Sequence, residues 1–281
     1  MRLSTVRAGG AERFGAVVGD GFVDLTEKFR GRCTGIADLL AKNLLGDALA
    51  MCAGAKPEYA IAELTFLPVI HRTDMRMFAL GWAYKDHQLE TGKDAPEFPN
   101  MFSKHPQSLV GHGQPIVRPR ASERFDYEGE VAIVIGKAGR NIPAERAMEH
   151  IAGYSIVMDG SMRDFQKHSV TAGKNFDASS AFGPWLVTRD EIPDPAKMEL
   201  TTRLNGKVMQ HSGFDLMAWD LGYLLNYIST FCRLEPGDVI STGTPGGVGN
   251  RRDPQVFMKG GDVIEVEVTG IGTLKNTVVD E

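Results

Sequence analysis

The sequence contains little cysteine, and its three cysteines, Cys33, Cys52 and Cys232, form no C-x-x-C pair. They therefore indicate neither a disulfide framework nor a zinc knuckle, and we expect reduced, mostly buried thiols. No run of Lys or Arg is present, and the net charge of −5 argues against binding to nucleic-acid phosphates. No stretch approaches the roughly 18 apolar residues of a membrane span, and the first residues lack the apolar segment of a secretory signal. These absences predict a cytoplasmic protein that binds neither nucleic acid nor membrane.

What is present is the composition of an ordinary globular protein. The chain has 281 residues, of which 42% are apolar and 24% charged, and this balance argues against disorder and fibrous repeats. Such a length accommodates one large domain, or one domain with a small appendage. Gly, Pro, His and Asp become frequent near Thr73. We therefore expect a small N-terminal region, residues 1–70, followed by a larger part, residues 71–281, in which the motifs concentrate.

Local patterns alternate between strands and short helices. A Gly19-Asp20-Gly21 turn between two β-prone runs predicts a hairpin. Apolar residues at helical spacing over 35–53, interrupted by Gly46, predict one or two short helices, and the longest helical stripe covers 215–233. Residues 260–278 alternate as a strand does. Because no regular β-α-β order appears, the pattern favours a β-rich α+β fold over a doubly wound sheet, a TIM barrel or a solenoid.

Two glutamates define the first candidate site. Residues 125–137 alternate as one strand, which places Glu128 and Glu130 on the same face, about 7 Å apart, where both can converge on one cation. A solvated polar face on a half-exposed strand is the alternative. The next apolar strand, YSIVMD, ends in Asp159 and adds a third carboxylate. Oxygen ligands of this kind suit Mg²⁺, Mn²⁺ or Ca²⁺ rather than zinc.

Two further features could take part in acid-base chemistry. His87 and Glu90 are spaced i, i+3, so on one helical turn they face the same way and could take a proton from water. An exposed pair on a surface turn is the alternative. Lys174 lies in a polar segment rich in Gly and Ser, where it could hold developing negative charge or be one of many surface lysines.

The order and spacing of several segments between about Met75 and Asn276 resemble the fumarylacetoacetate hydrolase family. The segments are FALGWAYKDHQLE, FDYEGEVAIVIGKAGRNI, AGYSIVMDGSMRDFQK, GKNFDASSAFGPWLV, LNGKVMQ, LEPGDVISTGTPGGVG and KGGDVIEVEVTGIGTLKN. This resemblance implies an α+β, β-rich fold in which a mixed β-sandwich rolls around a metal site, with a small N-terminal α/β region. It also implies a homodimer.

The resemblance implies roles for individual residues. Glu128, Glu130 and Asp159 match ligands of a divalent cation, normally Mg²⁺ or Mn²⁺, with Ca²⁺ also compatible. The remaining matches are the water-activating dyad His87 and Glu90, a third catalytic residue Lys174, and the substrate contacts Tyr84, Arg163, Gln166 and Thr244. The family commonly has Asn before the tyrosine, where this chain has Ala83 preceded by Trp82. Such departures affect the expected substrate rather than the cation site.

The function implied by the resemblance is hydrolysis of a carbon-carbon bond in an acylpyruvate, giving pyruvate and a carboxylic acid, in the catabolism of aromatic or related compounds. An alternative on the same metal site is decarboxylation or tautomerisation of a 2-oxo acid such as oxaloacetate. The dyad favours hydrolysis, because that reaction requires a base that delivers water. A metal-dependent binding protein without turnover is the third alternative.

Overall fold

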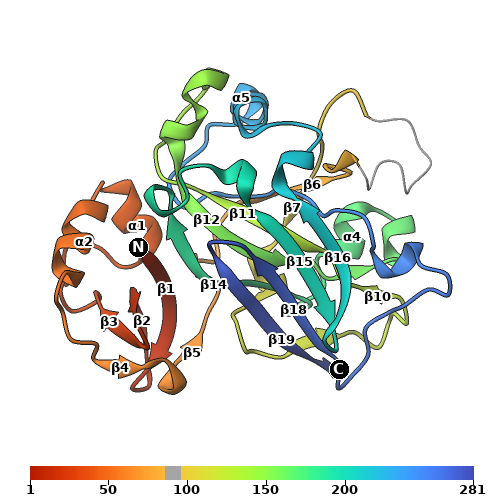
Figure 1. The fold of residues 1–281 in the computed structure, drawn as a ribbon, viewed down its shortest axis with the longest axis horizontal. Coiled ribbons are helices and arrows are strands. Elements are labelled where there is room, and N and C mark those ends of the chain that lie inside the picture. Colours follow the sequence, from red (N-terminus) through yellow and green to blue (C-terminus); the bar gives the residue numbers. More distant parts are fainter. Residues whose placement is uncertain (86–95) are drawn as a thin grey trace.

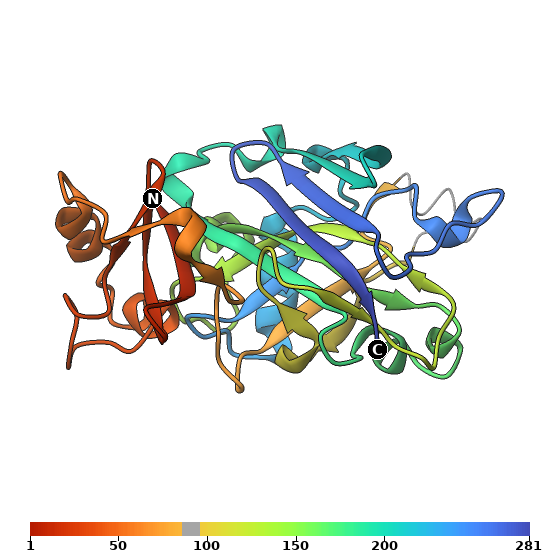
Figure 2. The same ribbon diagram turned by 90° about the horizontal axis from the view of Figure 1, so that it is seen from below.

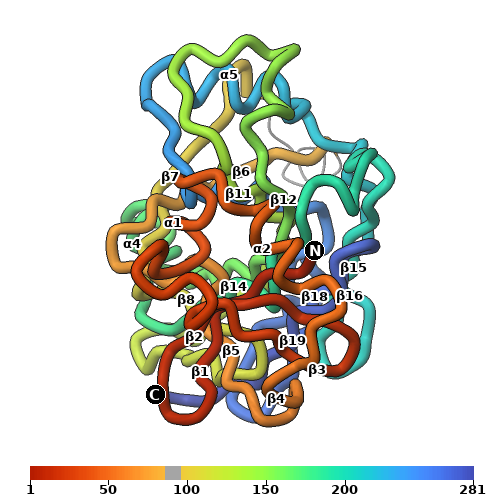
Figure 3. Tube along the Cα trace, turned by 90° about the vertical axis from the view of Figure 1, so that its left-hand side faces the viewer, coloured from red at the N-terminus to blue at the C-terminus, as the bar shows by residue number. Residues whose placement is uncertain are grey.

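The computed structural model describes residues 1–85 and 96–281, and a large curved sheet forms its framework (Figure 1). The N-terminal region supplies one end of this sheet. Its elements are β1 (Arg2–Ala8), β2 (Ala11–Val18), β3 (Gly21–Asp24), α1 (Ile36–Ala41), α2 (Leu45–Cys52), β4 (Tyr59–Ala60) and β5 (Thr65–Phe66). Figure 3 shows these elements from the N-terminal side of the molecule.

The predicted N-terminal hairpin is confirmed, because Val18 pairs with Gly21 across the turn. Two short helices follow, as expected, but the break between them lies at residues 42–44 rather than at Gly46, which is inside α2. Asn43 has a φ of 54°, in the left-handed region that ends a helix and that Asn tolerates better than most residues.

The remaining strands of the large sheet come from the rest of the chain. They are β6 (Met77–Gly81), β7 (Asn100–Lys104), β8 (Leu109–Val110), β11 (Gly129–Ile135), β12 (Ile151–Met158), β14 (Ser180–Thr188) and β17 (Val239–Ser241). The main path runs β4-β3-β2-β1-β14-β12-β11-β17-β6-β7, with β5 beside β1 and β8 beside β14. Because β1 pairs antiparallel with β14, strands from both sides of residue 70 share one sheet. A division at that residue stays a prediction.

Two smaller sheets and the remaining helices complete the described structure. The smaller sheets contain β10 (Phe125–Asp126) with β13 (Ser161–Met162), and β16 (Lys207–Gly213), β15 (Glu199–Leu204), β18 (Val263–Val268), β19 (Gly272–Asp280) and β9 (Ile116–Arg118) in that order. Figure 2 shows β18 and β19 crossing over the strands of the large sheet. The remaining described α-helices are α4 (Val170–Lys174) and α5 (Leu221–Phe231), and the longest of several 3₁₀-helices covers Ala144–His150. This confirms the β-rich α+β class.

Within the described ranges, no helix has both the length and the apolar character needed to cross a membrane.

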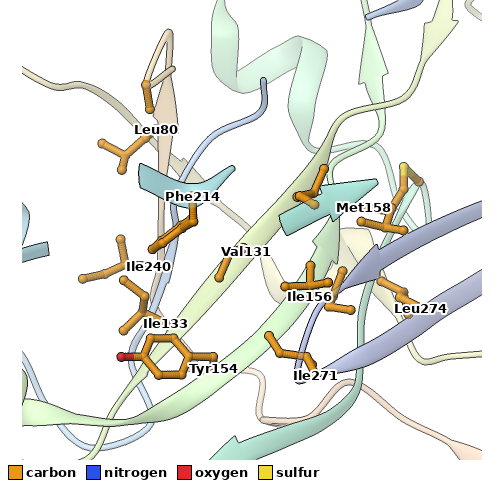
Figure 4. Packing of buried hydrophobic residues seen from close by; sticks show 14 of the residues in the cluster. Leu80, Val131, Ile133, Tyr154, Ile156, Met158, Phe214, Ile240, Ile271 and Leu274 are labelled. Carbon is orange, nitrogen blue, oxygen red and sulfur yellow. The ribbon is translucent and has the colours of Figure 1, made fainter. Parts of the chain in front are cut away.

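Strands β11 and β12 are buried on both faces and lie in the middle of the large sheet. Val131 and Ile133 pack with Tyr154 and Ile156, toward the five-stranded sheet (Figure 4). The alternate residues, such as Val134, point to a second core shared with α1 and α2. A strand covered on both faces is expected to be continuously apolar, as the sequence VAIVI is.

The single strand predicted over 125–137 is wrong in its first part. Phe125 and Asp126 form β10, which pairs with β13, and the strand of the large sheet begins only at Gly129. The backbone changes partner here because the Asp126 carboxylate accepts the N–H of Tyr127, and the Gln210 side chain accepts the N–H of Gly129. On either side of Glu128, side-chain acceptors therefore take the place of backbone hydrogen bonds between strands.

Gly153 of β12 offers a test of this packing. A Cβ atom at residue 153 would lie 2.0 Å from the carbonyl oxygen of Val187, which belongs to the neighbouring strand and cannot move aside alone. We expect Gly153→Ala to lower the free energy of unfolding by about 1–3 kcal/mol in urea denaturation. Gly46→Ala is the control, because residue 46 is helical and has open space around it, and it should raise stability by roughly 0.5–1 kcal/mol. Equal effects of the two variants would contradict the packing argument.

Candidate active site and metal centre

Three carboxylates meet at one end of the central strands. Glu128 precedes β11, Glu130 lies in it, and Asp159 follows β12. The pairing of Gly129 with Met158, and a 2.8 Å hydrogen bond from the Asp159 N–H to the Glu128 carbonyl, bring these positions together. One carboxylate oxygen from each residue lies within 4.8 Å of the others, and all three side chains are buried. We call these three residues the acidic cluster.

Glu130 has the environment expected of a cation ligand. Its Oε2 accepts hydrogen bonds from the Ser241 hydroxyl at 2.5 Å and from the Gly243 N–H at 3.0 Å. Its Oε1 is buried and has no hydrogen-bond partner among the residues that the structure describes. Burial, reinforced by the charge of Asp159, raises the pKa of Glu130 to about 8. A buried oxygen without a donor is unfavourable unless a proton or a cation occupies the position beside it.

Two buried lysines balance the acidic cluster. Lys174 Nζ forms ion pairs with Asp159 Oδ2, at 2.7 Å, and with Glu128 Oε2. Burial opposes the charge on Lys174, but Asp159 and Glu128 outweigh it and raise its pKa. Only 3% of the surface of Lys174 is exposed. The alternative that Lys174 is one of many surface lysines is therefore wrong. On the other side, Lys104 Nζ lies 2.7 Å from Asp159 Oδ1.

Lys104 was not predicted from the sequence. It is a lone lysine at the end of β7, and nothing in its neighbourhood marks it, because its contacts are with residues far along the chain. Its Nζ also donates a 2.5 Å hydrogen bond to the Lys174 carbonyl. Burial lowers the pKa of Lys104.

Asp126 is a second residue that the sequence analysis missed. Its carboxylate accepts hydrogen bonds from the Arg163 Nε at 2.8 Å and from the N–H groups of Gly249 and Asn250 at 2.8 and 2.9 Å. Arg163 then reaches Glu128 Oε1 at 2.7 Å through its Nη2. The Asp126 side chain therefore connects the acidic cluster, through Arg163, to the loop that follows β17. Its place two residues before Glu128, on the same predicted strand face, was the available signal.

Several predicted substrate contacts line one cavity of about 310 Å³ next to the acidic cluster. Its described lining consists of Leu80, Gly81, Trp82, Asn100, Phe102, Glu128, Arg163, Gln166, Val170, Lys174 and Thr244. Gln166 Oε1 accepts a 3.0 Å hydrogen bond from Arg163. The Thr244 hydroxyl is held between the Gly129 carbonyl and the Gln210 amide.

One predicted substrate contact lies away from this cavity. Tyr84 is fully buried in the hydrophobic core and is not among the residues that line the cavity. His87 and Glu90 fall outside the described residues.

The charges of this region favour a divalent cation. Four carboxylates, from Asp126 and the acidic cluster, face three basic side chains, from Lys104, Arg163 and Lys174. One negative charge is left over, and a proton on Glu130 neutralises it. A divalent cation in place of that proton leaves one positive charge, which a single substrate carboxylate can balance. Carboxylate oxygens are also the donors that Mg²⁺ and Mn²⁺ prefer, so the residues present fit such an ion.

Asp126 can be tested through stability. Asp126→Asn removes the charge that faces the buried Arg163. We therefore expect the free energy of unfolding, measured in urea, to fall by about 3 kcal/mol. The control, Asp194→Asn, affects a solvent-exposed pair with Lys197 and should change stability by less than about 1 kcal/mol. Similar values for both variants would show that the Asp126 network contributes little.

Comparison with known proteins places the chain and its fold in a family. The family model described as fumarylacetoacetate (FAA) hydrolase C-terminal matches residues 76–279. A mitochondrial oxaloacetate tautomerase of Bos taurus is 40% identical over 222 residues, which cover 78% of this chain and 70% of the relative. The oxaloacetate tautomerase YisK of Bacillus subtilis is 37% identical over 226 residues, covering 78% and 75%.

Solved structures agree over the full length. A fumarylacetoacetate hydrolase from Exiguobacterium antarcticum aligns with a TM-score of 0.84 and 33% identity, covering all of both chains. A maleylpyruvate hydrolase from Sphingobium sp. SYK-6, in complex with manganese(II) and pyruvate, aligns with a TM-score of 0.83 and 25% identity, covering 100% of this chain and 99% of the other. The chain therefore belongs to the fumarylacetoacetate hydrolase family.

Proposed function

We propose that this protein is a divalent-cation-dependent tautomerase that interconverts the keto and enol forms of a short 2-oxo acid bearing a second carbonyl or carboxyl group at C3. The observation that carries the proposal is the buried acidic cluster with Lys174 beside it, at the wall of a cavity large enough for such an acid. The names of the oxaloacetate tautomerases to which the chain is similar support this reaction over hydrolysis.

Glu128, Glu130 and Asp159 would hold the cation. When bound, a divalent cation of the Mg²⁺ or Mn²⁺ type supplies Lewis-acid polarisation of the 2-oxo group. The residues of the chain keep the three ligands in place: Ser241 and Gly243 orient Glu130, and Lys104 orients Asp159.

In this proposal Lys174 acts on the oxygen at which negative charge develops. Tautomerisation removes one proton from C3 of the keto acid and places one on the 2-oxo oxygen, so no water is consumed. The Lys174 ammonium is kept charged by the neighbouring carboxylates and donates hydrogen bonds toward that oxygen. Arg163 and Gln166, joined by their own hydrogen bond, present donors to the substrate carboxylate. We assign removal of the C3 proton to the predicted His87 and Glu90 pair.

Hydrolysis of an acylpyruvate is the second candidate. It adds water across the bond between C3 and C4 and releases pyruvate and a carboxylic acid. The observation that favours it is the full-length similarity to the manganese- and pyruvate-bound maleylpyruvate hydrolase. The same pair, His87 and Glu90, would then act on water.

One assay separates the two reactions. The purified protein with Mn²⁺ is given oxaloacetate or acetylpyruvate, and ultraviolet absorbance follows the enol while a lactate dehydrogenase couple detects pyruvate. Accelerated loss of enol without pyruvate supports the tautomerase, whereas pyruvate and acetate in equal amounts from acetylpyruvate support the hydrolase. Lys174→Met should lower kcat by about 10²–10³-fold. Lys197→Met, at an 83% exposed side chain, is the matched control and should retain full activity. Wild-type rates in Lys174→Met would contradict the proposed role.

The pKa of Glu130 gives a pH dependence for cation binding. The folded protein holds a proton on Glu130 up to about pH 8, whereas the usual carboxyl value is 4.5, and a cation can bind only after this proton leaves. We expect the Mn²⁺ affinity of the folded protein, measured by titration calorimetry, to rise by at most about tenfold per pH unit as the pH approaches 8. Above about pH 8 the affinity should level off, because Glu130 has then lost its proton. Without cation, the free energy of unfolding should fall as the pH rises from about 4.5 to about 8, because the folded state binds the Glu130 proton more tightly than the unfolded state does.

Glu130→Gln is the control for this prediction. It should weaken Mn²⁺ binding more than about tenfold, because a ligand is lost, and should remove the pH dependence of stability in that window. A flat affinity profile in the unmodified protein would contradict the assignment of the proton to Glu130.

A further inference from the structure

Strand β7 extends from the acidic cluster along the cavity. Lys104, Phe102 and Asn100 are spaced by two residues, so their side chains share one face of the strand at intervals of about 7 Å. Lys104 contacts Asp159, and the Phe102 ring centroid lies 5.4 Å from Lys174 Nζ. Asn100 is therefore the residue of this face farthest from the acidic cluster. The cavity thus has an anchoring end at the cluster and a distal end near Asn100.

The described residues of the distal end have uncharged side chains. Asn100 pairs with Gly81 of β6, and a Cβ atom on Gly81 would lie 3.1 Å from the Asn100 side-chain nitrogen, so the amide rests against the backbone of β6. Trp82 comes next and also lines the cavity. Its φ of 57° is in the left-handed region, which is unfavourable for a non-glycine residue. Such strain persists where the surroundings hold a residue in place, and it is common at ligand sites.

The basic side chains of the described lining lie at the anchoring end. Among the described residues that line the cavity, the basic ones are Arg163 and Lys174, and both are already paired with carboxylates. With a divalent cation bound, one substrate carboxylate neutralises the region. A second carboxylate would enter a partly buried space without a basic partner from these residues, which is unfavourable.

We propose, building on the function proposed above, that Trp82, Asn100 and Phe102 select 2-oxo acids whose distal group is uncharged, such as acylpyruvates with a small alkyl or aryl end. Phe102 contacts the first atoms beyond C3, and Asn100 and Trp82 contact longer acyl groups. Oxaloacetate, for which the relatives are named, is then a poorer substrate than its uncharged counterpart.

Acetylpyruvate and oxaloacetate make the direct comparison, because they differ only in a methyl or an ionised oxygen on C4. The enol-to-keto rate is measured for both with the same Mn²⁺-loaded protein. We expect kcat/KM to favour acetylpyruvate by about tenfold or more. Equal values, or a preference for oxaloacetate, overturn the inference.

Binding without reaction gives a second readout. 2-Oxopentanoate and 2-oxoglutarate have the same number of carbons and differ in a terminal methyl or carboxylate. Titration calorimetry of the Mn²⁺-loaded protein should show tighter binding of 2-oxopentanoate by a similar factor of about ten. Tighter binding of 2-oxoglutarate, or binding of neither acid, overturns the inference.

Variants connect the preference to the named residues. Asn100→Lys places a cation at the distal end. It should shift the kcat/KM ratio and the binding ratio toward the dicarboxylate by about tenfold, whereas Asn100→Gln should shift neither ratio. Trp82→Gly relieves the left-handed backbone while it removes the ring, and should weaken acyl-chain discrimination. Asn43→Gly, at a φ of 54° in the N-terminal region, is its backbone control and should leave the ratios unchanged. Ratios unaffected by Asn100→Lys in a protein with normal thermal unfolding contradict the assignment.

The two proposals fail in different ways. Tight binding of 2-oxopentanoate without turnover of either keto acid contradicts the proposed function and leaves the selectivity inference supported. Turnover with a preference for oxaloacetate supports the proposed function and contradicts the selectivity inference.

Discussion

The burial of like charges in a small volume is the constraint on which this structure depends. Carboxylates this close to one another inside a protein repel strongly, and each must be offset by a cation or a proton. Lys104 and Lys174 supply the cations on either side of Asp159. Strands β7 and β12 are separated by three others in the sheet order, yet Lys104 of β7 reaches the end of β12. The curvature of the sheet is therefore what makes the charge balance achievable.

This balance also separates a general part of the site from a specific part. In the proposed function, the acidic cluster, Lys174 and Arg163 recognise features that all 2-oxo acids share, namely a carboxylate and a neighbouring oxo group. Removal of a proton next to that oxo group develops the same negative charge whichever 2-oxo acid is bound. The distal end differs in kind, since in the proposed selectivity its side chains contact only the part of the substrate that varies. Members of one family can therefore retain the first part and change substrate through the second.

The sequence predicted the acidic cluster because its signal is local. Glu128 and Glu130 are two residues apart near one strand, and Asp159 ends the next strand, so hairpin-like pairing is enough to bring them together. Lys104 and Asp126 escaped prediction for a different reason. The first depends on how the sheet curves, and the second on a loop more than 120 residues away that donates its N–H groups.

The same distinction applies to the fold. The N-terminal hairpin and the two short helices follow from turn and periodicity rules, whereas the break before Gly129 follows from a side chain, Gln210, that competes with the strand ladder. Patterns with a period of a few residues are visible in the sequence. Competition between distant side chains and the backbone is not.

The pairing of β1 with β14 has a consequence for how this chain tolerates shortening. Without β1, the backbone N–H and C=O groups around Leu186 and Val187 would form an open sheet edge in an apolar stretch. Exposed edges of this kind recruit strands from other molecules and promote aggregation. Strand β1 thus covers that edge, and a version of this protein reduced to residues 71–281 would need a different shield to stay in solution.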